Sequence, residues 1–179
     1  MRIIDSTLFS PFYIFIKASD LSDSEVLNLL GIKKFELLNK YQKHPKNWQK
    51  KRTLFITECK NWIHIMDFMD YNLWHNPQLR INLELISKKY DIFYCSTGDD
   101  DYSYDFTYLK EGILKRKLIV EYPNYKGPII KENIGKRLLG ESEKIVLKDE
   151  RKEVLSIAKA IGINLNHEES KIRQYLYEL

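Results

Sequence analysis

The stretch IFYCSTGDDDYSYDFTYLKEGILKRKLIVEY, residues 92–122, decides the fold class. Its ranges 92–97, 102–109 and 113–122 are rich in aromatic and β-branched residues, which favour strands. The aspartate turn 98–101 and the loop 110–112 separate these ranges, and Gly112 can supply the positive φ that a short hairpin loop requires. The stretch therefore predicts consecutive hairpins of an antiparallel sheet.

Local signals upstream predict further strands and two helices. Strand patterns occur at residues 12–16, 53–59 and 61–68. Ser22 and Glu25 match a capping box that starts a short helix, and Asn76-Pro77 matches the start of a second, amphipathic helix. Range 32–42 fits either period and is expected to be mostly loop. We expect an α+β fold, with an antiparallel sheet of about five to six strands and a helix packed on one face.

The chain after Pro123 is more charged and its pattern predicts helices. Range 149–161 carries an apolar stripe that ends at Gly162. A last helix is expected to begin near Asn166, with Glu169 completing a capping box. We therefore expect a core domain over residues 1–122 and a helical C-terminal extension over residues 123–179. The extension, a helical pair, is expected to dock on the core within one structural unit.

The composition is that of a globular protein and is only mildly basic. The chain has 179 residues, 44% apolar and 30% charged, with a formal net charge of +4. Its cysteines, Cys59 and Cys95, lack the spacing of a disulfide framework, and its start, Met1-Arg2-Ile3-Ile4-Asp5, carries no apolar leader segment. No apolar run approaches the roughly 20 residues that cross a bilayer. We expect a cytoplasmic protein without a membrane segment.

Residue types with metal-binding or catalytic chemistry are present, but their spacing fits no known pattern. Asp99, Asp100 and Asp101 with Asp105 nearby offer carboxylate oxygens, yet consecutive aspartates in a turn point apart and the calcium-loop pattern is absent. The pair Cys95 and His64 lies in no nucleophile motif, and Cys59, Cys95, His64 and His75 lack the paired spacing of zinc ligands. We expect no metal, no cofactor and no catalytic residue. A hydrolase with an unfamiliar site is kept as a second alternative.

The turn at residues 99–104 is the leading candidate for a partner surface. Asp99, Asp100 and Asp101 would stand beside Tyr102 and Tyr104 as an acidic, aromatic patch. Aromatic residues are enriched at recognition surfaces, and charge complementarity favours a cationic partner. We therefore expect a protein partner with a basic surface, while the oligomeric state stays open.

A basic segment supports nucleic-acid binding as the alternative. Its candidate residues are Lys46, Trp48, Lys50, Lys51 and Arg52, which combine cations for phosphate contacts with a ring for base stacking. The C-terminal segment does not fit a helix-turn-helix, because its expected recognition helix carries Glu168 and Glu169, which repel phosphate.

The order of these elements resembles a loose group of bacterial proteins. A strand containing Trp62 is followed by a helix ending at Tyr90, the strand 91–94, the Tyr104 strand, the turn 110–112 and a charged strand. This order, over residues 53–165, resembles uncharacterised bacterial proteins of the polymorphic-toxin immunity type. The resemblance implies a non-enzymatic protein-binding module that neutralises a toxin, and it carries no catalytic residue.

Overall fold

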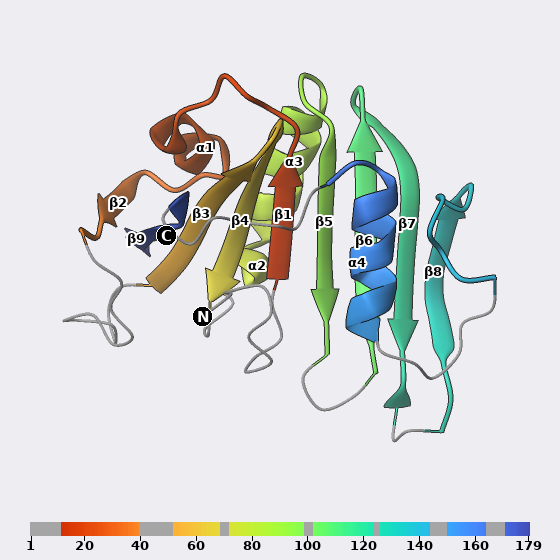
Figure 1. The fold of residues 1–179 in the computed structure, drawn as a ribbon. Helices are drawn as coiled ribbons and strands as arrows, with labels where there is room; N and C mark the ends of the chain where they lie inside the picture. Colours follow the sequence, from red (N-terminus) through yellow and green to blue (C-terminus); the bar gives the residue numbers. More distant parts are fainter. Residues whose placement is uncertain are drawn as a thin grey trace.

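The described residues form one antiparallel sheet of nine strands. The computed structural model describes residues 12–39, 52–68, 72–98, 102–123, 126–143, 150–163 and 171–179. The strands follow the order β2-β9-β3-β4-β1-β5-β6-β7-β8, and all neighbours are antiparallel (Figure 1). The strands are β1 Phe12–Ile16, β2 Lys34–Leu37, β3 Arg52–Cys59, β4 Trp62–Phe68, β5 Ile92–Thr97, β6 Tyr104–Lys110, β7 Ile113–Glu121, β8 Ile129–Gly135 and β9 Arg173–Glu178.

The expected fold class is therefore wrong. The described part of the chain is mostly β, with nine strands in place of an α+β layer of five to six strands and a C-terminal helical pair. Three strands account for the difference: β2 lies in the range expected to be mostly loop, and β8 and β9 lie in the part expected to be helical. β8 and β9 belong to the same sheet as the strands before residue 122.

The C-terminal strand shows why the sequence pattern misled. Tyr175 and Tyr177 pack on one side of the sheet, in the same cluster as Leu54 of β3, because β9 lies between β2 and β3. The apolar residues of this segment fit both a helical stripe and a strand. The pairing partners that favour the strand lie more than 110 residues away, at Arg52–Ile56 and Lys34–Leu37.

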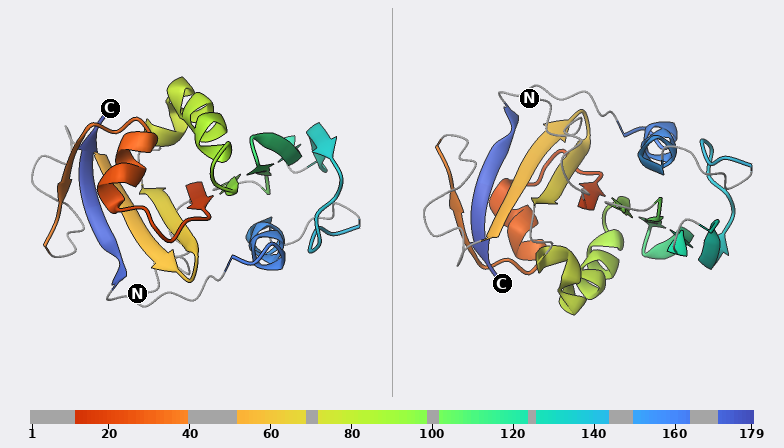
Figure 2. Two further views of the ribbon diagram at one scale, coloured as in Figure 1. Left: turned by 90° about the horizontal axis from the view of Figure 1, so that it is seen from above. Right: turned by 90° about the horizontal axis from the view of Figure 1, so that it is seen from below.

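The helices lie on both faces of the sheet. They are α1 Asp23–Leu29, α2 Asn72–His75, α3 Pro77–Ser87 and α4 Glu150–Ala160. α1 and α3 share one apolar cluster, whereas α4 covers the opposite face (Figure 2). The expectation of helix on one face alone is thus incomplete. Within the described ranges, every helix is too short or too polar to span a bilayer.

The local helix starts are confirmed. The Ser22 hydroxyl accepts from the Glu25 amide, and the Glu25 carboxylate accepts from the Ser22 amide at 2.8 Å, which completes the capping box. The Asn76 side chain accepts from the Gln78 amide at 3.0 Å, with Pro77 as the first residue of α3. These signals involve neighbours in sequence and so can be recognised without the fold.

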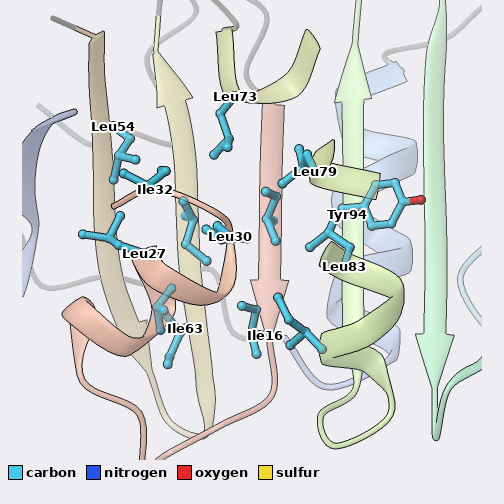
Figure 3. Close-up of a cluster of buried hydrophobic side chains, with 14 of the residues drawn as sticks. Ile16, Leu27, Leu30, Ile32, Leu54, Ile63, Leu73, Leu79, Leu83 and Tyr94 are labelled. Atoms are coloured by element: carbon cyan, nitrogen blue, oxygen red, sulfur yellow. The ribbon is translucent and has the colours of Figure 1, made fainter. Parts of the chain in front are cut away.

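Alternation along the strands builds two cores, one on each face. Ile63 and Ile65 of β4 point to the face of α1 and α3, while Trp62 and Met66 point to the face of α4. The first cluster includes Leu27 of α1 and Leu30 directly after it, Leu79 and Leu83 of α3, and Ile16, Leu54 and Tyr94 of the sheet (Figure 3). The second cluster includes Phe15, Phe93, Cys95 and Phe106 of the sheet with Val154 and Ile157 of α4. Burial on both faces explains why the central strands are largely apolar, although His64 and Asp67 of β4 are buried polar residues.

Candidate functional site

The structure separates the two tyrosines of the expected partner patch. Asp99, Asp100 and Asp101 lie outside the described residues. The Tyr102 side chain is 41% exposed, and its ring meets that of Tyr122 edge to face at a centroid distance of 6.0 Å. Tyr104 instead points into the second cluster, where desolvation, with a smaller effect of Glu153, raises its pKa well above the usual value. Within the described part of the patch, Tyr102 alone is exposed.

Asp105, one residue beyond Tyr104, has a structural role in the β5–β6 hairpin. Its Oδ1 accepts from the Ser96 amide at 2.8 Å and from the Ser96 hydroxyl at 2.6 Å. Desolvation raises the pKa of Asp105, although these hydrogen bonds and the charges of Arg80 and Lys117 act in the opposite direction. The carboxylate therefore fixes the hairpin at some electrostatic cost.

Arg80 of α3 stands over two aromatic rings beside this hairpin. Its guanidinium carbon lies 4.2 Å from the Trp74 ring centroid and 4.8 Å from the Tyr94 ring centroid. Such cation–π contacts offset part of the hydration energy that a cation loses on burial. Its Nη1 is buried and forms no hydrogen bond in the described structure. The group ties α2 and α3 to β5.

The basic segment is almost entirely outside the described residues. Lys46, Trp48, Lys50 and Lys51 fall in the range 40–51. Arg52 is the first residue of β3, where it pairs in register with Tyr177 of β9. The structure thus places one of the five candidate residues, at the start of a strand.

The histidines and the cysteine whose side chains the structure describes, His64, His75 and Cys95, do not form one cluster. Cys95 is fully buried, and desolvation raises its pKa well above the usual value, so that the unreactive thiol is favoured. His64 is also fully buried, with its ring edge to face with Phe15 at 4.5 Å, and β1 separates its strand from that of Cys95. His75 lies at the end of α2 against Phe12. No group of three or more potential metal ligands occurs among the side chains that the structure describes.

A surface that sequence reasoning missed follows β8. The chain turns back toward α4 after β8 (Figure 2), and we call residues 136–142 the Leu139 turn. Arg116 of β7 donates from Nε to Glu141 Oε1 at 2.9 Å and from Nη2 to Glu141 Oε2 at 2.8 Å. The two side chains are only 5% and 4% exposed. Arg116 also donates to the Asn133 side chain at 2.6 Å, so the pair joins the turn to both β7 and β8.

Further contacts fix the turn to α4. Glu141 Oε1 accepts from the Leu138 amide at 2.6 Å, and Glu153 of α4 accepts from the Ser142 amide and hydroxyl at 2.7 and 2.6 Å. Gly140 has a φ of +93°, and a Cβ there would lie 2.9 Å from the Ser156 carbonyl oxygen. Leu138 packs on the second cluster, whereas Leu139 is 81% exposed. The sequence Leu138-Leu139 gives no sign of which leucine is outside.

Other buried ionisable groups are committed to the fold. Asp67 of β4 accepts from the Tyr177 hydroxyl at 2.8 Å and from the Trp74 amide at 3.1 Å, and the same hydroxyl accepts from the Leu73 amide at 3.2 Å. Desolvation, followed by the charge of Asp67, raises the pKa of Tyr177. This network joins the last strand to β4 and α2.

Comparison with known proteins adds no assignment. No protein-family model, curated protein or solved structure matches the chain.

Proposed function

We propose that the chain is a non-enzymatic protein-binding module of the immunity type, which neutralises a toxin by forming a complex with it. The single observation that supports protein binding is that large apolar side chains are exposed on the last two strands in the sheet order and on the turn that follows them. They belong to β7, β8 and the Leu139 turn: Ile113, Ile129, Ile130, Ile134 and Leu139. Large apolar side chains exposed on neighbouring elements are a feature of interaction surfaces.

The uses of the buried charges favour binding over catalysis. Glu141 holds a turn, Asp67 holds the last strand and Asp105 holds a hairpin. A hydrolase requires a nucleophile, a base and an oxyanion donor that converge on one point. These three carboxylates instead each contact a different structural partner, and the buried Cys95 favours its thiol form.

The immunity role rests on the resemblance described above and on this exposed surface. A cytoplasmic location is part of the proposal, because a buried free thiol at Cys95 suits a reducing compartment. A basic partner surface at Asp99–Asp101 and Tyr102 stays a prediction, as do nucleic-acid binding through Lys46–Arg52 and a hydrolase with an unfamiliar site.

Co-expression tests the proposal. The product of the neighbouring gene is expressed alone and together with this chain, and growth and complex formation by size-exclusion chromatography are measured. We expect growth arrest by that product alone, with relief and co-elution when the chain is present. Unrelieved arrest with separate elution would contradict the immunity role. Binding of a mixed RNA pool with a steep salt dependence would favour the nucleic-acid alternative.

A further inference from the structure

Leu139 combines high exposure with a fixed backbone. At 81% it is the most exposed of the large apolar side chains that the structure describes. Hydrogen bonds from Arg116 to Glu141 and from Ser142 to Glu153 hold this turn, and the Gly140 backbone lies too close to Ser156 to leave room for a Cβ. A single exposed leucine is ordinary on a protein surface. A leucine held outward by a buried ion pair needs a further explanation.

Fixing the turn before binding lowers the cost of binding. Association normally loses the conformational entropy of the loop that becomes ordered at the interface. Here the hydrogen bonds of Glu141 and Ser142 already order the backbone on both sides of Leu139. Leu139 can therefore enter an apolar pocket with little further ordering, as a central interface residue does.

The exposed charges on and beside the turn are mostly cationic. Lys136 and Arg137 directly precede Leu138 and are exposed. Lys159 is exposed on α4, three residues after Ser156, whose carbonyl oxygen faces Gly140 of the turn. None of these three cations forms an ion pair with a described residue, and Glu141 is buried against Arg116. The exposed cations Lys136, Arg137 and Lys159 outnumber the one exposed anion beside the turn, Glu143, while Glu153 is bound to Ser142. This excess of positive charge complements an acidic partner.

We infer that the Leu139 turn is the anchor by which this chain binds a protein partner with an apolar pocket surrounded by acidic side chains. The inference rests on the proposed function and names the chemistry of the partner. The turn requires an apolar pocket for Leu139 in addition to anionic groups for the cations. This combination favours a protein over a nucleic acid, whose phosphates complement the cations only.

The edge strand β8 is a weaker candidate for the same partner. An open strand edge can pair with another strand, but β-bulges and charged side chains oppose this pairing. The β7–β8 register shifts at Ile119/Val120. Lys117 pairs with Glu132 at 2.8 Å, and Lys131 pairs with Glu121 at 3.2 Å. The middle of β8 is therefore irregular and charged.

Site-specific photo-crosslinking in the source cells tests the anchor. The probe is Leu139→p-benzoylphenylalanine, and the control is Leu85→p-benzoylphenylalanine, at a 55% exposed position on α3. We expect a protein adduct at position 139 that is absent at position 85. A protein adduct formed at Ile130 or Tyr102 but not at 139 would refute the anchor and leave the proposed function intact. Absence of a protein adduct at all four positions would contradict the proposed function, and an RNA adduct at 139 would refute the protein partner.

The partner identified in this way is then purified, and its affinity is measured by titration at low and high salt. Leu139→Ala should weaken binding at least about tenfold. Lys136→Glu with Arg137→Glu should weaken binding about tenfold at low salt, with a smaller effect at high salt, because screening removes exposed charge attraction. Unchanged affinity in the Leu139 variant, or tighter binding after charge reversal, would overturn the inference.

Discussion

Replacing Arg116 by methionine should destabilise the protein strongly. Arg116→Met leaves the Glu141 carboxylate, 4% exposed, without the bidentate partner that donates at 2.9 and 2.8 Å. Removal of one partner from a buried ion pair costs about 3–5 kcal/mol, because the remaining charge is buried and uncompensated. That is a large fraction of the roughly 5–15 kcal/mol by which domains are stable. The exposed pair Lys34–Glu178, with side chains 79% and 45% exposed, provides the matched control.

Urea unfolding, followed by the fluorescence of the buried Trp62 and Trp74, measures the cost. Lys34→Met should change the free energy of unfolding by less than about 1 kcal/mol. The double variant Arg116→Met with Glu141→Leu should recover much of the loss, since neither charge is then left buried alone. A loss below about 1 kcal/mol in Arg116→Met would refute the reasoning about this pair, as would a double variant whose loss equals the sum of the two single losses.

Three further predictions concern other parts of the fold. Tyr177→Phe removes the hydroxyl that donates to the buried Asp67 at 2.8 Å. Urea unfolding should show that the free energy of unfolding falls by about 1.5–3 kcal/mol. An unchanged free energy of unfolding would argue against this hydrogen bond. The pKa of Asp105 is raised in the folded state, mainly by desolvation, so its contribution to stability is fully present below the unfolded pKa and is lost as pH rises through the folded pKa. Asp105→Asn, which keeps the Oδ1 acceptor, should therefore be more stable than the native chain at pH 7, and this gain in stability should shrink toward pH 3. A gain in stability that is independent of pH would exclude desolvation of the carboxylate as its cause. Gly135→Ala should lower the thermal unfolding temperature more than Gly127→Ala does. Both positions have positive φ, but only a Cβ at position 135 would clash with backbone, at the Lys115 carbonyl oxygen. Equal losses in the two variants would contradict the clash.

Elements with local signals could be predicted from the sequence. The hairpin at residues 110–112 forms as expected, with Glu111 and Gly112 both at positive φ and the Gly112 amide bonded to the Ser87 carbonyl. The starts of α1 and α3 depend on side chains within three residues of the backbone that they cap. Such contacts form wherever the local sequence allows them, so the pattern is sufficient.

Elements that depend on distant partners could not be predicted. Range 171–179 presents apolar residues at Ile172, Tyr175, Leu176 and Leu179, which fit a helical stripe. Its strand conformation follows from pairing with β2 and β3, and the Tyr177 hydroxyl contacts Asp67, 110 positions earlier. Tertiary pairing overrides local preference here.

The Leu139 turn was missed for a related reason. Leu138 and Leu139 are identical in type and adjacent, and their opposite burial follows from the ion pair of Arg116 with Glu141 and from the position of α4. The sequence contains each partner but not their proximity. The expected acidic patch, in contrast, was inferred from consecutive charges in a turn, whose surroundings the sequence does not specify.

Isothermal titration of the purified partner with the native chain and with Leu139→Asp tests most directly whether this turn binds an acidic protein surface. The account predicts that the aspartate variant, which places a charge in the apolar pocket and repels the acidic surroundings, binds at least about a hundredfold more weakly while unfolding at the same urea concentration as the native chain. Equal affinity of the two proteins would contradict it.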